Sequence, residues 1–183
     1  MSTPAERYAA ARQRRERTRQ MGPLASEREI FTGRLDFTLD EFQRLSCEHL
    51  ASGRDVLVAA PTGAGKTVVG EFAVHLALAR GRKAFYTTPI KALSNQKFLD
   101  LGRVHGAENV GLLTGDTSVN ADAPVVVMTT EVLRNMLYAD SEALTDLGYV
   151  VMDEVHYLAD RFRGAVWEEV IIHLPESVQV VSL

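Results

Sequence analysis

The run Ala60-Pro61-Thr62-Gly63-Ala64-Gly65-Lys66-Thr67 contains residue types that bind phosphate. Gly63 and Gly65 let the backbone turn tightly, so that several N–H groups can point at one phosphate. Lys66 would reach the β- and γ-phosphates of a nucleotide, and Thr67 would offer its hydroxyl to Mg²⁺. An apolar, strand-like run precedes this stretch and a helical pattern follows it, as a phosphate-binding loop requires. We therefore predict that the run binds a nucleotide.

The first motif is not a strict match, because Ala60 stands where the usual pattern has glycine. A second motif supports the prediction of a nucleotide site. An apolar run ends in Asp153-Glu154-Val155-His156. Asp153 would hold Mg²⁺ through its water shell, and Glu154 would polarise an attacking water, which is hydrolase chemistry. An isolated Asp-Glu pair is usually a solvated turn. Together with Lys66, these two carboxylates are the candidate catalytic residues, and we expect His156 to link the nucleotide site to the rest of the protein.

Apolar runs alternate with helical patterns along most of the chain. The strand candidates are Asp55 to Ala60, Lys83 to Thr88, Asn109 to Leu113, Val125 to Thr129, Tyr149 to Asp153 and Val178 to Leu183. The helix candidates are Leu39 to Ser52, Thr67 to Arg80, Ile90 to Val104, Glu131 to Asp140 and Phe162 to Leu174. Such apolar strands belong to a mainly parallel sheet with helices on both faces, an α/β fold. Its ligands should bind beyond the carboxyl ends of the strands.

Composition narrows the class of protein further. The 183 residues have a net charge of −4, but residues 1–29 carry seven arginines and four glutamates, so the basic charge is concentrated at the N-terminus. We expect residues 1–34 to form an Arg-rich arm or helix. Cys47 is the only cysteine, which excludes an internal disulfide framework and fits a reducing compartment. No run is long and apolar enough for a membrane span, so we expect a cytoplasmic protein.

In these residues and their order, the chain resembles the first RecA-like domain of a superfamily 2 helicase of the DExH class. More narrowly, it is similar to the superkiller-type RNA helicases, and especially to their bacterial HelY-type members. The resemblance covers residues 35–183 and implies a RecA-like P-loop fold, ATP and Mg²⁺ as cofactors, and single-stranded RNA as a partner. It also implies a possible association with RNA-degradation machinery.

Further motifs carry this resemblance, and each implies a role. In the run 37–43, Phe37 and Gln43 match the family's adenine-reading motif, since an amide can pair with the adenine edge. Three runs resemble motifs that contact the nucleic-acid backbone without reading its sequence. Their expected contact residues are Pro89, Lys91, Ser94, Asn95, Gln96, Thr114, Gly115, Asp116, Thr130 and Arg134. The run 160–169 resembles the superkiller-type continuation and identifies the family without doing chemistry.

The resemblance also predicts what else the protein needs. In the family, the strand near Val178 leads into a Ser-Ala-Thr motif, and the sequence ends at Leu183, where that motif would start. We therefore expect a fragment that binds nucleotide but turns over poorly without a second RecA-like domain. Two alternatives stay open: a DNA helicase or repair translocase, because backbone contacts do not reveal the sugar, and a nonenzymatic ATP-binding module.

Overall fold

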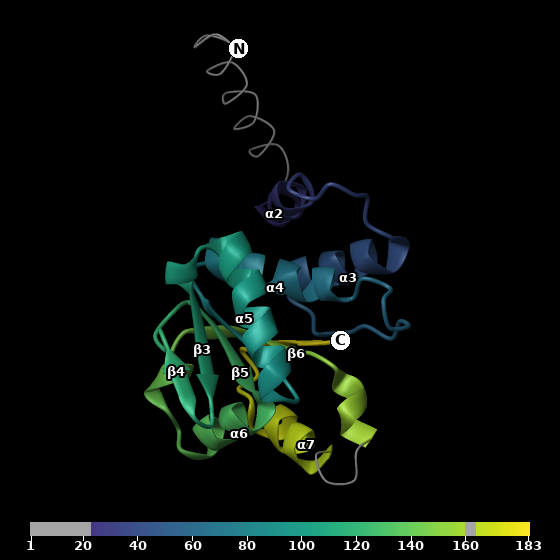
Figure 1. Cartoon of the computed structure of the whole chain (residues 1–183). Coiled ribbons are helices and arrows are strands. Elements are labelled where there is room, and N and C mark those ends of the chain that lie inside the picture. The colour runs from purple at the N-terminus through teal and green to yellow at the C-terminus, as the bar shows by residue number, and fades with distance from the viewer. Residues whose placement is uncertain (1–22, 160–163) are drawn as a thin grey trace.

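The computed structural model describes residues 23–159 and 164–183, and these form a seven-stranded sheet with the order β1-β7-β6-β2-β5-β3-β4. Every neighbouring pair is parallel except β3 and β4. The strands are β1 (Val56–Leu57), β2 (Lys83–Thr88), β3 (Val110–Thr114), β4 (Thr117–Val119), β5 (Val125–Thr129), β6 (Leu147–Met152) and β7 (Gln179–Ser182). The predicted mainly parallel sheet is confirmed (Figure 1).

Helices cover both faces of the sheet, as predicted (Figure 1). They are α2 (Pro23–Thr32), α3 (Glu41–Ala51), α4 (Thr67–Ala79), α5 (Lys91–His105), α6 (Thr130–Tyr138) and α7 (Gly164–His173), with 3₁₀ turns at Ala107–Asn109 (η1), Glu142–Leu144 (η2) and Val155–Ala159 (η3). In one core cluster, helices α2, α3, α4 and α5 pack against one face of the sheet. In the other, α6 and α7 pack against the opposite face. Both side-chain rows of the central strands are therefore buried, which explains why their sequences are continuously apolar.

The sheet differs from the prediction at its two edges. β1 is shorter than the expected run from Asp55 to Ala60, although the Val58 amide still donates to the Ser182 carbonyl (2.9 Å). The Asp55 carboxylate accepts from the Val180 amide (2.8 Å), so a side chain replaces a ladder bond there. The edge strand β4 was not predicted. It forms a hairpin with β3 and its residues are mostly exposed, so it lacks an apolar signal.

The helix α2 lies within the segment 1–34 that was expected to be an arm or helix, and it packs against α3 and α4. Phe31 is buried beside Phe72, with 5.1 Å between the ring centroids. Glu27 contacts the His75 Nε2 atom at 3.0 Å. The packed unit therefore includes residues before 35. The part of the expected Arg-rich arm or helix that precedes residue 23 lies outside the described residues.

Two further expectations concern single features of the chain. Cys47 is fully buried in the first core cluster, and burial raises the pKa of its thiol to about 12, which agrees with a packing role. Across residues 23–159 and 164–183, no helix has both the length and the apolar character needed to cross a membrane.

Candidate nucleotide site and nucleic-acid face

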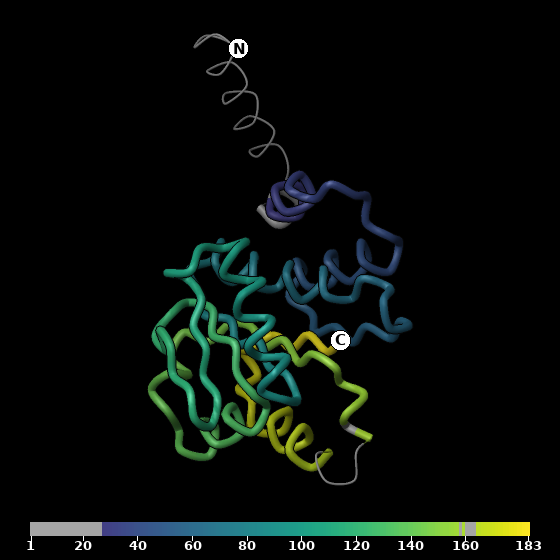
Figure 2. Tube along the Cα trace, in the orientation of Figure 1, coloured from purple at the N-terminus to yellow at the C-terminus, as the bar shows by residue number. Residues whose placement is uncertain are grey.

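The sheet brings the two predicted nucleotide motifs to one edge. The phosphate loop follows β1 and the acidic pair follows β6, and β7 lies between these two strands. Since the three strands are parallel, their carboxyl ends point the same way. The last residues of the chain, yellow in Figure 2, run beside β6. Their strand, β7, also contacts α4. This is the edge where open α/β sheets bind ligands.

The phosphate loop depends on glycine at two positions. Gly63 has φ +82° and Gly65 has φ +80°, a left-handed backbone that side chains with a Cβ rarely adopt. A Cβ on Gly65 would also lie 2.7 Å from the Gln43 Nε2 atom. The Lys66 Nζ atom donates to the Ala60 carbonyl across the loop (2.9 Å), which places its ammonium group inside the turn. Thr67 begins α4, so the positive end of that helix faces the loop.

Gln43 joins the loop to the start of α3. Its side chain is only 4% exposed, its Oε1 atom accepts from the Asp40 amide (2.8 Å), and its Nε2 atom donates to the Gly65 carbonyl (3.0 Å). Each end of the amide therefore makes one hydrogen bond within the protein and keeps one further donor or acceptor position. The adenine-reading role predicted for Gln43 would use these remaining positions. Phe37 is 49% exposed near the start of the same helix, which leaves its ring open to a base.

Replacing Gln43 with glutamate tests this link. A glutamate keeps the acceptor for the Asp40 amide but cannot donate to the Gly65 carbonyl. We expect Gln43→Glu to lower the free energy of unfolding by about 1 kcal/mol or more, the typical effect of losing one partner of a part-buried hydrogen bond. Urea denaturation measures this change. Gln96→Glu, at an exposed position of α5, is the matched control, and an equal effect of both changes would contradict the link.

Asp153 is held at both carboxylate oxygens. Its Oδ2 atom accepts from the Tyr86 hydroxyl (2.9 Å), and its Oδ1 atom accepts from the Glu154 amide (3.0 Å). Tyr86 is fully buried, and burial, followed by the nearby Asp153 charge, raises the pKa of the phenol well above its ordinary value. The phenol therefore stays protonated and can donate a hydrogen bond to Asp153. Sequence reasoning missed this residue, because the bond joins positions that are far apart in the chain.

Glu154 has an unusual backbone for its residue type. Its φ of +60° lies in the left-handed region, where non-glycine residues are rare and cluster at functional sites. The Glu154 Oε2 atom lies 3.1 Å from the His156 Nδ1 atom. His156 is exposed, and its ring packs at a tilt of 42° against Tyr157, with 4.8 Å between the ring centroids. The contact with Glu154 gives His156 a direct connection to the expected catalytic pair.

The side chains near the phosphate loop fit a Mg²⁺ ion that is bound together with a nucleotide. In the described part of the chain, no group of three or more His, Cys, Asp or Glu side chains could hold a metal. Mg²⁺ typically uses one or two carboxylates together with substrate phosphates and water, rather than a cage made by protein alone. Asp153 and the Thr67 hydroxyl would supply the protein's share. Mg²⁺ bound there would neutralise charge on the phosphates of the nucleotide.

The residues expected to contact nucleic acid form an exposed set and a buried set, and Arg134 is half-buried. The exposed set is Lys91, Asn95, Gln96, Gly115 and Asp116. The buried set is Pro89, Ser94, Thr114 and Thr130. The Ser94 hydroxyl bonds with the Thr88 hydroxyl (2.7 Å), and the Thr130 hydroxyl donates to the Thr88 carbonyl (3.3 Å). The hydroxyls of Ser94 and Thr130 therefore hold the loops that present the exposed set, and the nucleic-acid contacts expected for the buried set stay a prediction.

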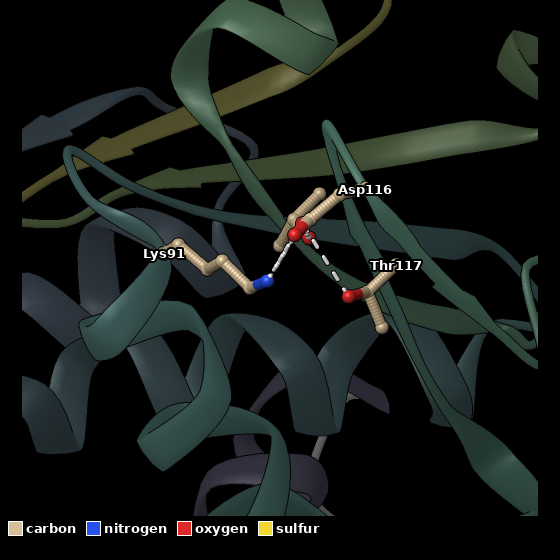
Figure 3. A network of polar contacts seen from close by, with 4 residues as sticks. Lys91, Asp116 and Thr117 are labelled. Carbon is tan, nitrogen blue, oxygen red and sulfur yellow. Dashed lines mark hydrogen bonds and ion pairs between the residues drawn. The ribbon is translucent and has the colours of Figure 1, made fainter.

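Lys91 and Arg134, the two cations of the predicted contact residues, each lie near a carboxylate. The Lys91 Nζ atom lies 2.7 and 2.6 Å from the two oxygens of Asp116, which also accepts from Thr114 and Thr117 (Figure 3). The hydrogen bonds from Lys91 and then Thr114 lower the pKa of Asp116 from its ordinary value. Arg134, on α6, lies 3.7 Å from the Glu169 carboxylate on α7. A phosphate approaching either cation would compete with a carboxylate.

Comparison with known proteins places this architecture in a family. Residues 40–183 match the family described as DEAD/DEAH box helicase. This chain belongs to that family. The helicase domain is 70% identical over 158 residues to the probable helicase HelY of Mycobacterium tuberculosis, covering 86% of this chain and 17% of HelY. The chain thus spans about a sixth of the length of that relative. The predicted resemblance to DExH helicases is confirmed.

Two further comparisons reach more distant helicases. The domain is 51% identical over 154 residues to the ATP-dependent RNA helicase DExH15 of Arabidopsis thaliana, covering 81% of this chain and 13% of that protein. The structure of Mycobacterium smegmatis helicase Lhr bound to ssDNA and AMP-PNP superposes with a TM-score of 0.66 at 28% identity, covering 91% of this chain and 25% of Lhr. These matches confirm the predicted RecA-like fold.

Proposed function

We propose that this domain is the ATP-binding half of the motor of an ATP-dependent RNA helicase, which couples ATP hydrolysis to movement along and unwinding of RNA. The observation that carries the proposal is the placement of the Lys66 loop and the Asp153-Glu154 pair at one sheet edge, on either side of β7. In this proposal Lys66 and Thr67 bind the phosphates and Mg²⁺, Asp153 holds the Mg²⁺ shell, and Glu154 polarises the attacking water.

RNA is the partner we favour over DNA. DExH15, at 51% identity, is named as an RNA helicase, whereas the Lhr structure at 28% identity holds ssDNA. Lys91, Asn95 and Gln96 of the exposed set can donate to phosphates, and phosphate contacts carry no information on the sugar. A DNA translocase is therefore the second candidate, and the Lhr complex is the observation that favours it.

The proposal includes a second RecA-like domain that completes the site. Arginines from such a domain stabilise the transition state in related motors, and their loss typically costs about 10³- to 10⁵-fold in rate. This chain matches about a sixth of the length of HelY, so HelY is long enough to contain such a domain as well. We further propose a cytoplasmic location, where ATP is supplied, and an association with RNA-degradation machinery.

A comparison of how RNA and DNA stimulate ATP hydrolysis tests this proposal. The protein extended through its second motor domain is assayed for Mg²⁺-dependent ATP hydrolysis with single-stranded RNA or single-stranded DNA of the same sequence. We expect RNA to stimulate hydrolysis more than DNA does. Stronger stimulation by DNA would support the translocase instead. An absence of stimulation by either would contradict a helicase motor and favour a nonenzymatic ATP-binding module.

Asp116→Asn is expected to tighten the binding of single-stranded RNA. The substitution removes the charge that holds the Lys91 ammonium group, so Lys91 becomes available to a backbone phosphate. Exposed ion pairs are weak, so we expect an increase in affinity of about two- to five-fold. Fluorescence anisotropy with a labelled RNA measures it at several salt concentrations, because a new phosphate contact also steepens the salt dependence.

Asp122→Asn is the matched control for this prediction, because Asp122 is exposed beyond β4 and outside the predicted contact set. A gain that is equal in both variants would indicate a general charge effect. Weaker binding of RNA by Asp116→Asn, with DNA binding unchanged, would contradict the prediction and indicate that Asp116 itself accepts from the ribose hydroxyl.

A further inference from the structure

We propose that Tyr86 is a positioning residue for the Mg²⁺ carboxylate: its hydroxyl fixes the orientation of Asp153 before the nucleotide arrives. The inference rests on the proposed function of Asp153. Tyr86 lies on β2, outside both nucleotide motifs, and it is fully buried. Its hydroxyl donates to the Asp153 Oδ2 atom at 2.9 Å. Tyr86 is therefore placed to act on the metal only through Asp153.

The two bonds to Asp153 leave the carboxylate able to hold a metal shell. The Tyr86 hydroxyl occupies one site on Oδ2, and the Glu154 amide occupies one site on Oδ1. An ionised carboxylate accepts at about four positions, so each oxygen keeps capacity for a metal-bound water. With one donor on each oxygen, rotation of the carboxylate breaks at least one bond. Its orientation is thus set by the protein rather than by the ligand.

The Tyr86 ring is itself fixed by the elements that carry the other motifs. A Cβ on Gly70 of α4 would lie 3.2 Å from the Tyr86 Cε2 atom, so the absence of a side chain there lets α4 pack closely over the ring. On the α5 side, the Lys97 Nζ atom lies 5.2 Å from the ring centroid. The helix after the phosphate loop and the helix that carries Lys91 therefore both contact the ring. Because Tyr86 bonds to Asp153, the position of Asp153 depends on both helices.

The effect of removing the hydroxyl is expected in metal binding. Partners of metal-binding side chains typically contribute about ten-fold or more in metal affinity. Tyr86→Phe keeps the buried ring and removes only the donor. We expect the Mg²⁺ affinity of the ADP complex to fall about ten-fold, with ADP binding in EDTA unchanged. A general packing defect would weaken both equally.

The test uses the 183-residue chain and a fluorescent ADP analogue, titrated with Mg²⁺ and measured again in EDTA. Tyr149→Phe is the matched control, because Tyr149 is also a buried tyrosine on the sheet but its hydroxyl contacts Arg80, at the end of α4 far from the loop. Circular dichroism and thermal melting show whether each variant is folded.

A double-mutant cycle with Asp153→Asn decides whether Tyr86 acts through the carboxylate. We expect Asp153→Asn to weaken Mg²⁺ binding, and Tyr86→Phe to add nothing in that background. Additive effects, an unchanged Mg²⁺ affinity in Tyr86→Phe, or an equal loss in Tyr149→Phe would each overturn the inference while leaving the role of Asp153 intact. If Asp153→Asn itself leaves Mg²⁺ binding unchanged, the proposed metal role fails, and this inference fails with it.

Discussion

Lys66→Ala is expected to lower ATP hydrolysis by about 10²- to 10³-fold in the protein that contains both motor domains. The Lys66 ammonium group lies inside the phosphate loop, bonded to the Ala60 carbonyl. From there it can reach the phosphate oxygens on which negative charge develops during transfer. Removing one preorganised donor from such a site typically has an effect of this size. Steady-state phosphate release in the presence of single-stranded RNA measures the change.

Lys83→Ala provides the control for this substitution. Lys83 begins β2, so it lies at the amino ends of the parallel strands, whereas the loop follows the carboxyl end of β1. Its Nζ atom donates to the Ala143 carbonyl (3.3 Å). The control removes the same charge and a comparable hydrogen bond, so we expect hydrolysis to be retained. If Lys66→Ala turned over as fast as the control, the run 60–67 would be a structural turn and the nucleotide site would lie elsewhere.

The second large effect is expected for Glu154→Gln, which should stop hydrolysis while ATP binding remains. Glutamine has nearly the shape of glutamate but cannot accept a proton from the attacking water. Loss of a general base typically lowers the rate by about 10²- to 10⁴-fold. Glu154 is expected to act on the attacking water rather than to bind the phosphates, so the affinity for nucleotide should change little. Single-turnover hydrolysis and equilibrium binding of ATP, measured on the same sample, separate the two quantities.

Glu168→Gln, at an exposed position of α7, is the matched control. The substitution at Glu154 also leaves the left-handed backbone in place, so a change in folding is not expected from φ alone. Weakened ATP binding without a slower chemical step would contradict the assignment of Glu154 as the base. It would indicate that the carboxylate acts on the metal or on His156, which lies 3.1 Å away.

The central part of the fold could be predicted from the sequence because of how parallel sheets are buried. β2, β5 and β6 are covered on both faces, so each reads as a continuous apolar run. The edges of the sheet do not follow this rule. β4 is short and mostly exposed, and β1 is held partly by the Asp55 side chain, so neither has a distinct apolar pattern.

The site was predictable where a local run forms it and not where distant residues meet. The loop residues and the acidic pair are each contiguous in sequence, and the structure places both at one edge. The bond from Gln43 to Gly65 and the bond from Tyr86 to Asp153 join separate elements. A single sequence contains no signal for such contacts. Likewise, small polar residues at a helix start read the same whether they face solvent or, like Ser94, the core.

The proposed half-motor is tested by measuring Mg²⁺-dependent ATP binding and hydrolysis in two forms of the protein. One form is this chain, and the other extends through its second motor domain. Each form is measured with and without single-stranded RNA. We expect that both forms bind ATP, that only the extended form hydrolyses it at an appreciable rate, and that RNA stimulates this hydrolysis. Rapid hydrolysis by the 183-residue chain that is indifferent to RNA would contradict both the helicase motor and the need for a second domain.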